Sequence, residues 1–286
     1  MKTDFSGYKA YLDERIKFYP FIKDMADLYD GLINIWENAL PDDLYPLIDI
    51  ERVSRGLSML DVGKIGGVSF TNSTQTAIKI FRFMEKQKTE HHISLVNTSG
   101  QDIAEFIVNS LSREDRYKNA ILKWVLKPSF NHLFSSFNKG GLREILEESG
   151  LLWNMGRCPV CFSPPGMAIV DAAEVSGTEL NSVPKEQRFL SCCFCEYRWI
   201  FKIIACPACG NDKPDKHGFF VGDAGCEQGT RAISCEECRT YIKTVFTGCR
   251  EDGKSSESLD MDIEDVATIP LDIIANQRGY RALCQR

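Results

Sequence analysis

The sequence predicts an α+β protein with a helical N-terminal domain, two tandem cysteine-rich metal-binding units and a C-terminal helix. Apolar residues recur at helical spacing near both ends of the 286-residue chain, and four Cys-x-x-Cys pairs lie between these regions. The predicted boundaries are 1–155 for the helical domain, 156–204 and 205–248 for the two metal-binding units, and 249–286 for a linker and the C-terminal helix. A composition that is 43% hydrophobic and 26% charged is typical of a folded chain with several cores.

The first 155 residues show the spacing of amphipathic helices. Apolar side chains recur every three or four positions in two stretches, namely Ile22, Met25, Tyr29, Leu32, Ile33, Trp36 and Leu40, then Ile103, Phe106, Ile107 and Leu111. Ser112 and Asp115 predict the capped start of a further helix, which Pro128 bends or ends. The stretch 62–76 is rich in Gly, Ser and Thr, and it predicts a long connection.

The cysteine pairs have the spacing of tetrahedral metal ligands. Two thiolates separated by two residues grip one side of an ion, so four pairs supply two closed four-cysteine sites. The predicted ligands are Cys158, Cys161, Cys192, Cys195, Cys206, Cys209, Cys235 and Cys238. The spacing fits either iron or zinc. His217 lies between the last two pairs, but four thiolates already complete that site, so we expect a structural role for this histidine.

A tandem repeat predicts which cysteine pairs share a metal. CPVC followed by RFLSCCFC recurs as CPAC followed by RAISCEEC, with Arg188 and Arg231 at matching positions. A repeated unit that carries its own metal joins the first pair to the second and the third pair to the fourth. The alternating segment 196–205 also predicts one strand of roughly 30 Å, too long for the two middle pairs to meet at one ion. A cross-braced arrangement is the alternative.

Beyond the cysteine pairs, the chain returns to helical spacing. Residues 248–258 are small and charged, and they predict a linker. Apolar residues then recur as one helical stripe, at Ile263, Val266, Ile269, Ile273 and Ile274. Pro270 is expected in the first turn of this helix or at a kink within it.

Charge and the N-terminal stretch bear on partners and compartment. The formal net charge is −6, and residues 157–249 hold ten Lys or Arg against eleven Asp or Glu, which argues against the basic face that nucleic acid requires. A polar N-terminus and the lack of a long apolar run predict a cytoplasmic protein without membrane insertion, in which clustered thiols bind metal. No phosphate loop or nucleophile signature is found, so no catalytic residue is predicted. The sequence leaves the oligomeric state open.

The order of these motifs resembles a known family. WNMGRCPVCFSPP, RFLSCCFCEYRW, CPACG, CEECRTYIKTV and DVATIPLDIIANQRGYR, which lie between Trp153 and Arg281, resemble the formate dehydrogenase accessory proteins, also called formation proteins. The resemblance implies two rubredoxin-like units with iron or zinc. It also implies a cytoplasmic assembly chaperone, without catalysis of its own, that binds the catalytic subunit of respiratory formate dehydrogenase during maturation. A rubredoxin-like redox protein and a nucleic-acid-binding zinc-ribbon protein are the alternatives.

One residue departs from the pattern of this family. Phe162 follows the first cysteine pair, where the family usually has a glycine such as Gly210 after the third pair. The position after such a pair favours φ above zero, which a bulky aromatic residue adopts only at a cost. We therefore expect a strained backbone at Phe162.

Overall fold

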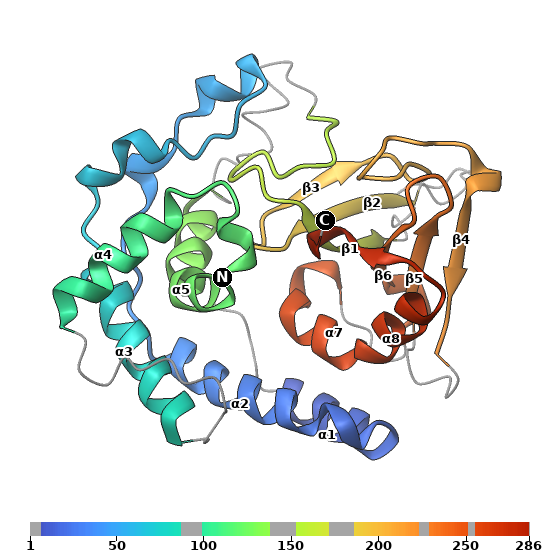
Figure 1. Ribbon diagram of the computed structural model, residues 1–286, viewed down its shortest axis with the longest axis horizontal. Helices are drawn as coiled ribbons and strands as arrows, with labels where there is room; N and C mark the ends of the chain where they lie inside the picture. The colour runs from blue at the N-terminus through green and yellow to red at the C-terminus, as the bar shows by residue number, and fades with distance from the viewer. Residues whose placement is uncertain are drawn as a thin grey trace, which may run out of the picture. The chain divides into compact units, whose positions relative to one another are not determined.

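The computed structural model describes residues 7–86, 99–137, 153–171, 186–222, 229–250 and 255–285 (Figure 1). Its internal contacts divide the chain into two units. The helical unit comprises Met1–Phe5, Asp24–Leu152 and Pro159–Phe162, and the sheet unit comprises Ser6–Lys23, Trp153–Cys158 and Ser163–Arg286. The predicted α+β class, with helices ahead of and behind the cysteine-rich part, is confirmed. The boundaries proposed for the domains stay predictions.

Four α-helices build the described part of the helical unit. They are α2 (Lys23–Glu37), α3 (Thr71–Lys86), α4 (Gly100–Leu111) and α5 (Ala120–Phe137). Short 3-10 turns at Tyr45–Leu47, Ile50–Arg55 and Val62–Gly67 connect α2 to α3. The predicted stripes are largely buried, although Met25, Leu40 and Phe106 are exposed. None of the helices in the described segments is long and apolar enough to cross a membrane.

Helix α3 corrects the prediction for residues 62–76, because it begins at Thr71 within that stretch. Its first-turn amides are capped from a distance. The buried carboxylate of Asp42 accepts hydrogen bonds from the backbone N–H groups of Asn72 at 2.9 Å and Ser73 at 2.7 Å. A cap normally comes from the residue just before the helix. A cap 30 residues upstream leaves no local signal, so the sequence indicated a loop.

The predicted start of the next helix is also wrong. Ser112 is the C-cap of α4, whereas α5 begins at Ala120. Asn119 supplies the cap, because its Oδ1 accepts a hydrogen bond from the amide of Leu122 at 3.0 Å. Ser99 and Asp102 form the capping box that begins α4.

Helix α5 continues through Pro128 instead of ending there. A proline has no N–H, so the carbonyl four residues earlier, that of Trp124, loses its usual intrahelical donor. The indole of Trp36 replaces that donor with a hydrogen bond of 2.9 Å to the Trp124 carbonyl oxygen. Tyr29 packs edge-on against both indoles. The tertiary contact therefore lets an apolar helix keep an internal proline.

One seven-stranded sheet forms the core of the described sheet unit, with the order β3-β2-β1-β6-β5-β4 and with β7 beside β6 (Figure 1). Its strands are β1 (Pro165–Asp171), β2 (Gln187–Cys192), β3 (Arg198–Phe201), β4 (His217–Phe220), β5 (Thr230–Cys235), β6 (Thr240–Phe246) and β7 (Arg281–Ala282). Within each repeat the strands are antiparallel. Parallel pairing of β1 with β6 joins the two repeats into a single sheet.

Three α-helices lie in the described part of the sheet unit, where the sequence predicted one C-terminal helix. They are α1 (Tyr8–Phe18), α7 (Met261–Ala267) and α8 (Ile269–Gln277). The break falls at Thr268, whose hydroxyl bonds back to the Glu264 carbonyl at 2.6 Å, and Pro270 sits in the first turn of α8 as predicted. Helix α1 is held to this end of the chain, since the hydroxyl of Tyr11 donates to the Glu264 carboxylate at 3.0 Å.

Candidate metal centres

The eight predicted cysteines come together as two groups of four. In each group, the four Sγ atoms lie within 4.8 Å of one another. The first group is Cys158, Cys161, Cys192 and Cys195, and the second is Cys206, Cys209, Cys235 and Cys238. This is the sequential arrangement that the tandem repeat predicts. Four thiolates at such separations could hold one tetrahedral ion in each group.

The backbone around the cysteines has the form of a tight turn at each pair. The amides of Phe194 and Cys195 point at the Cys192 sulfur, at 3.4 and 3.5 Å. The amide of Cys158 donates to the Ser163 carbonyl at 2.9 Å, and that of Cys206 makes the equivalent bond to Asn211 at 2.8 Å. Amide donors aimed at sulfur favour the thiolate, the form that binds a metal.

The residue after every pair has a left-handed backbone. The φ angles are 62° at Phe162, 62° at Glu196, 75° at Gly210 and 54° at Arg239. The prediction for Phe162 is confirmed. The same geometry at Glu196 and Arg239 was not predicted, although the sequence places both directly after a pair. Only Gly210 adopts this conformation without the steric cost that a Cβ brings.

The two groups differ in their exposure to solvent. All four cysteines of the first group are buried, whereas in the second group Cys209 is exposed and Cys238 is half-buried. Burial raises the pKa of the Cys235 thiol to about 12 and also raises the pKa of Cys209. Since a metal ligand must be a thiolate, the charge of a bound ion would be needed to hold these groups ionised.

His217 and Thr240 support the second group from outside it. The Nε2 of His217 lies 3.0 Å from the carbonyl oxygen of Asn211, within the turn of the third pair, and the histidine is not among the grouped ligand residues. The hydroxyl of Thr240 lies 3.0 Å from the Cys238 sulfur and 3.8 Å from that of Cys206. A hydroxyl at this distance can donate to a thiolate and stabilise its charge.

The two arginines that recur in the repeat make different contacts. The contacts of Arg188 also explain why the prediction of a single strand over 196–205 is wrong. Strand β3 covers only Arg198–Phe201, and the chain then turns. The buried Arg188 donates through Nη1 to the carbonyls of Lys202, Ile203 and Ala205, at 3.3, 3.2 and 2.9 Å. These bonds shape the turn that leads into the third cysteine pair. Arg231 instead stacks on two phenylalanine rings, Phe219 and Phe246.

The C-terminal motif holds the fourth cysteine pair. Arg239 donates to the Tyr280 hydroxyl at 2.9 Å and to the Arg278 carbonyl at 2.7 Å, and its guanidinium lies 3.9 Å from the centre of the Tyr280 ring. The Tyr280 hydroxyl in turn donates to Glu236, between the two cysteines of that pair. These contacts give a physical reason for a Gly-Tyr motif to accompany the cysteine pairs in the sequence.

Gly156 links the two repeats ahead of the first cysteine. A Cβ at this position would come within 1.8 Å of the Pro207 carbonyl oxygen, in the turn of the third pair. The indole of Trp199 donates to the Met155 carbonyl at 3.1 Å and fixes the same segment. Sequence reasoning assigned no role to this glycine, because the close approach comes from a segment that is distant along the chain.

The remaining thiols and a carboxylate group lie outside the two cysteine groups. Cys193 is half-buried, Cys249 is exposed, and burial raises the pKa of Cys284. Cys226 lies outside the described residues. Carboxylate oxygens of Glu196, Asp260 and Asp262 also lie within 4.8 Å of one another. Asp260 has a structural task there, because its carboxylate caps the first turn of α7.

Comparison with known proteins gives curated relatives that are named FdhE homologs. No family model matches the chain. The FdhE homolog of Aquifex aeolicus is 30% identical over 129 residues, which are 45% of this chain and 40% of that protein. FdhE homologs of Shewanella baltica (strain OS185) and Stutzerimonas stutzeri are 30% and 28% identical, over 44% and 43% of this chain and 36% and 35% of their own lengths. Each match thus spans well under half of the curated relative.

A solved structure extends the comparison to the fold. The crystal structure of the FdhE protein from Pseudomonas aeruginosa covers 98% of this chain and 95% of its own, with a TM-score of 0.55 and 16% identity. This likeness concerns the fold, while the sequence matches come from the curated homologs. The predicted resemblance to the formate dehydrogenase accessory family is therefore confirmed. The chain shares sequence with FdhE homologs and its fold with an FdhE protein.

Proposed function

We propose that the protein is a cytoplasmic assembly chaperone, which binds the catalytic subunit of respiratory formate dehydrogenase during maturation. The observation that carries the proposal is a pair of four-cysteine groups, each with one cysteine at the end of a strand of the same sheet, in a chain that resembles FdhE homologs over part of its length. We further propose that each group holds an iron or zinc ion. The acidic balance of the chain supports a protein partner over a nucleic acid.

The metals are proposed to stabilise the fold. Each repeat contributes only three short strands, and units of that size seldom bury enough apolar area to fold without a metal or a disulfide. A group with four protein ligands also leaves no open coordination position for a substrate, unlike catalytic zinc sites. A closed site therefore supports a structural role and a protein without catalysis of its own.

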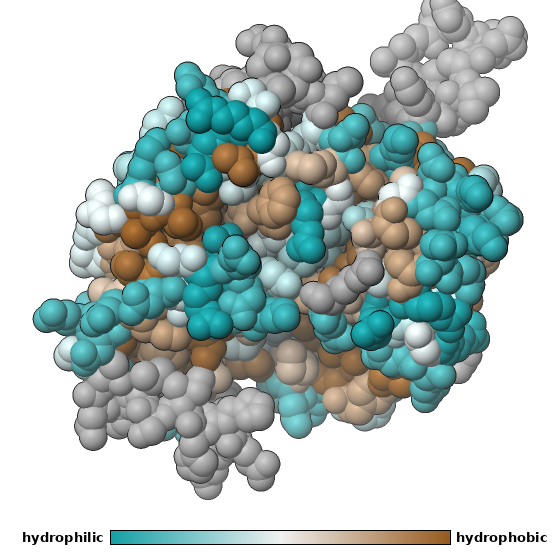
Figure 2. All heavy atoms as spheres, turned by 45° about the horizontal axis from the view of Figure 1, so that its top comes forward, coloured by the Kyte–Doolittle hydropathy of each residue, from teal (hydrophilic) through white to brown (hydrophobic). Residues whose placement is uncertain are grey.

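Apolar residues at the surface of the sheet unit support a role in binding polypeptide. Ile200 on β3, together with Ile203 and Ile204 in the turn after it, is between 36% and 48% exposed. Figure 2 shows hydrophobic residues reaching the surface between hydrophilic ones on the face drawn. Exposed apolar residues that cluster on a soluble fold are typical of binding surfaces.

Co-purification tests the proposal in cells that lack the protein. Supplying the chain should restore formate dehydrogenase activity, and the tagged chain should capture the catalytic subunit. Cys158→Ser and Cys206→Ser should both abolish capture, whereas Cys249→Ser, which changes an exposed thiol outside the groups, should not. Unchanged enzyme activity without the protein, no captured subunit and tight binding of nucleic acid at physiological salt would together replace the chaperone with a nucleic-acid-binding ribbon.

The exposure of the second group favours one alternative, a rubredoxin-like electron-transfer protein. Electron transfer needs a metal close to the surface and a metal that changes oxidation state, which zinc does not. Metal analysis and a visible spectrum of protein purified without added metal decide between the two roles. Iron with ferric-thiolate absorbance that is reversibly bleached by reductant supports electron transfer, and two equivalents of zinc exclude it.

A further inference from the structure

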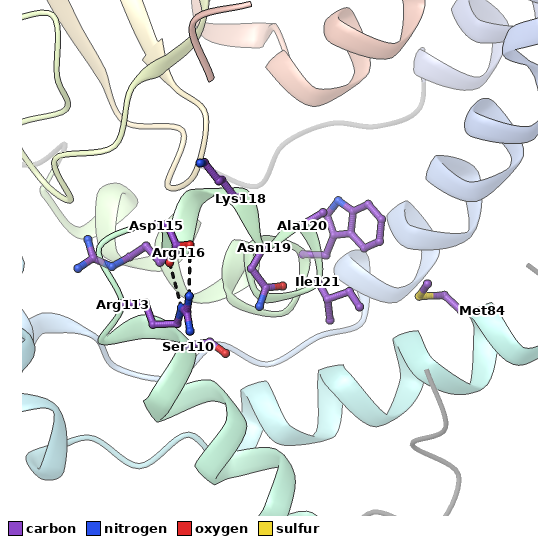
Figure 3. Close-up of a pocket in the computed structure, with 10 residues that line it drawn as sticks. Met84, Ser110, Arg113, Asp115, Arg116, Lys118, Asn119, Ala120 and Ile121 are labelled. Carbon is purple, nitrogen blue, oxygen red and sulfur yellow. Dashed lines mark hydrogen bonds and ion pairs between the residues drawn. The ribbon is translucent and has the colours of Figure 1, made fainter. Parts of the chain in front are cut away.

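The helical unit contains a pocket that the proposed function does not use. It lies at the start of α5 and has a volume of about 520 Å³, within the usual range for small-molecule sites (Figure 3). Residues from the end of α4, from the following turn and from the first turn of α5 line it. The whole lining belongs to the helical unit.

Two hydrogen-bond donors in the lining have no partner among the described residues. Ser110 is only 8% exposed, and its hydroxyl makes no hydrogen bond within the described part of the chain. Asn119 uses Oδ1 to cap Leu122, so its Nδ2 donor is not needed for the cap. In Figure 3 the side chains of Ser110, Asn119 and Arg113 lie near one another on one side of the pocket. Ser110 is thus largely buried and Asn119 half-buried, and a ligand in the pocket could accept hydrogen bonds from both.

The first turn of α5 adds positive potential to the same place. Ala120 and Ile121 line the pocket, and their amides are among the N-terminal groups that have no intrahelical acceptor. The helix is 18 residues long, so its dipole places a partial positive charge at this end. Such helix ends bind carboxylate and phosphate groups.

The charged residues of the lining give the same sign. Arg113 forms an ion pair with Asp115, with N–O distances of 2.9 and 3.3 Å, so the charges of these two residues offset each other. Arg116 and Lys118 leave a surplus of two positive charges, in a chain whose net charge is −6. The Arg116 guanidinium is fixed at the edge by the carbonyls of Leu111 at 2.7 Å and Cys161 at 2.9 Å. Local positive charge on an acidic chain favours an anion.

One part of the pocket wall is apolar. Met84, Ile121 and Trp124 line it, and the Trp124 backbone is held by the Trp36 indole. We propose that the pocket binds a small organic anion, a carboxylate or phosphate ester that carries an apolar group. The oxyanion is bound by Ser110, Asn119 and the first turn of α5, and its apolar part packs on this wall. The proposal does not depend on the chaperone role.

Calorimetric titration of the full chain with three probes tests the ligand class. Phenyl phosphate should bind with one-to-one stoichiometry, inorganic phosphate at least tenfold more weakly, and benzyl alcohol not measurably at millimolar concentration. Benzoate in place of phenyl phosphate separates carboxylate from phosphate ligands. If none of the charged aromatic probes binds at millimolar concentration, or if benzyl alcohol binds as well as phenyl phosphate, the proposal is wrong.

Variants that are expected to change phenyl phosphate affinity in opposite directions locate the site. Asn119→Asp keeps a side-chain oxygen for the helix cap but replaces the Nδ2 donor by a negative charge, so phenyl phosphate affinity should fall at least tenfold. Asp115→Asn removes an exposed negative charge near the ligand and frees Arg113, so affinity should rise about threefold. Arg55→Gln removes an exposed cation of the same unit, away from the pocket lining, and should change nothing. Equal responses of all three variants would mean that the probe binds the general surface.

Discussion

The two repeats share a sequence pattern but differ at equivalent positions of their third strands. Counting five residues beyond the last cysteine of each repeat gives Ile200 in the first and Lys243 in the second. Ile200 is 36% exposed, whereas Lys243 is 3% exposed. The apolar residue thus faces solvent and the charged residue lies inside, the reverse of what hydropathy alone predicts.

The C-terminal helices explain this inversion. Lys243 reaches Asp265 at 2.6 Å and Asp272 at 2.7 Å, and the Tyr241 hydroxyl bonds to the same Asp272 carboxylate at 2.7 Å. A buried ammonium is tolerated where carboxylates pair with it. Residues 261–277 therefore complete the second repeat, and the comparison teaches that a duplicated metal-binding unit can bury different residues according to what covers its sheet.

Cysteine replacement should have the largest effect, and it tests whether the groups are independent. Cys158→Ser and Cys206→Ser should each remove one metal equivalent and leave the other group occupied. Structural four-cysteine zinc sites contribute metal-binding free energy of about 10 kcal/mol or more, so we expect partial unfolding of the affected repeat. Metal content and circular dichroism measure both effects.

The matched control is Cys249→Ser, at an exposed thiol outside both groups, which should keep both metals. Loss of both ions from a variant that stays folded would point to shared ligands and would contradict the sequential pairing. Because all four sulfurs of the first group are buried, Cys158→Ser should be the more destabilising of the two ligand variants.

Lys243→Met should lower the free energy of unfolding by about 3 kcal/mol, because it leaves the partly buried Asp272 carboxylate, which Tyr241 still contacts, without its cation. At the equivalent exposed position of the first repeat, Ile200→Ser should change stability by less than about 0.5 kcal/mol. Chemical denaturation of the two variants compares the repeats directly.

A second substitution sharpens the Lys243 prediction. Adding Asp272→Leu to Lys243→Met removes the stranded charge and should recover part of the lost stability. If Lys243→Met and Ile200→Ser have equal effects, the buried ion pair does not distinguish the repeats.

The two matching arginines should differ by a smaller amount. Arg188→Leu removes hydrogen bonds to three carbonyls and should cost about 2 kcal/mol, since bonds to charged donors are among the stronger ones. Arg231→Leu removes only stacking on Phe219 and Phe246, worth about 1 kcal/mol. Thermal unfolding of both variants gives the order, and a larger loss for Arg231→Leu would contradict it.

Sequence reasoning succeeded where the signal is local and failed where a distant residue supplies it. The cysteine spacing predicts the two groups, and the position after Cys161 predicts the strained Phe162. The start of α3 was missed because its cap is Asp42. The strand over 196–205 was predicted too long, because Arg188 captures the carbonyls that bend it. The fused sheet depends on a parallel pairing between β1 and β6, which no local pattern encodes.

Phe162→Gly should have the smallest effect. It separates backbone strain from the contacts of the side chain at the position after a cysteine pair. Phe162 has φ of 62° and is 42% exposed, so glycine should relieve a backbone cost of about 1 kcal/mol while it gives up the packing of the covered part of the ring. Retention of the first metal against a chelator should therefore improve. Arg239→Gly relieves the same kind of strain at φ of 54° but deletes the contacts to Tyr280 and Arg278, so retention of the second metal should weaken. Weaker retention in Phe162→Gly would show that packing of this aromatic ring outweighs the strain of its backbone.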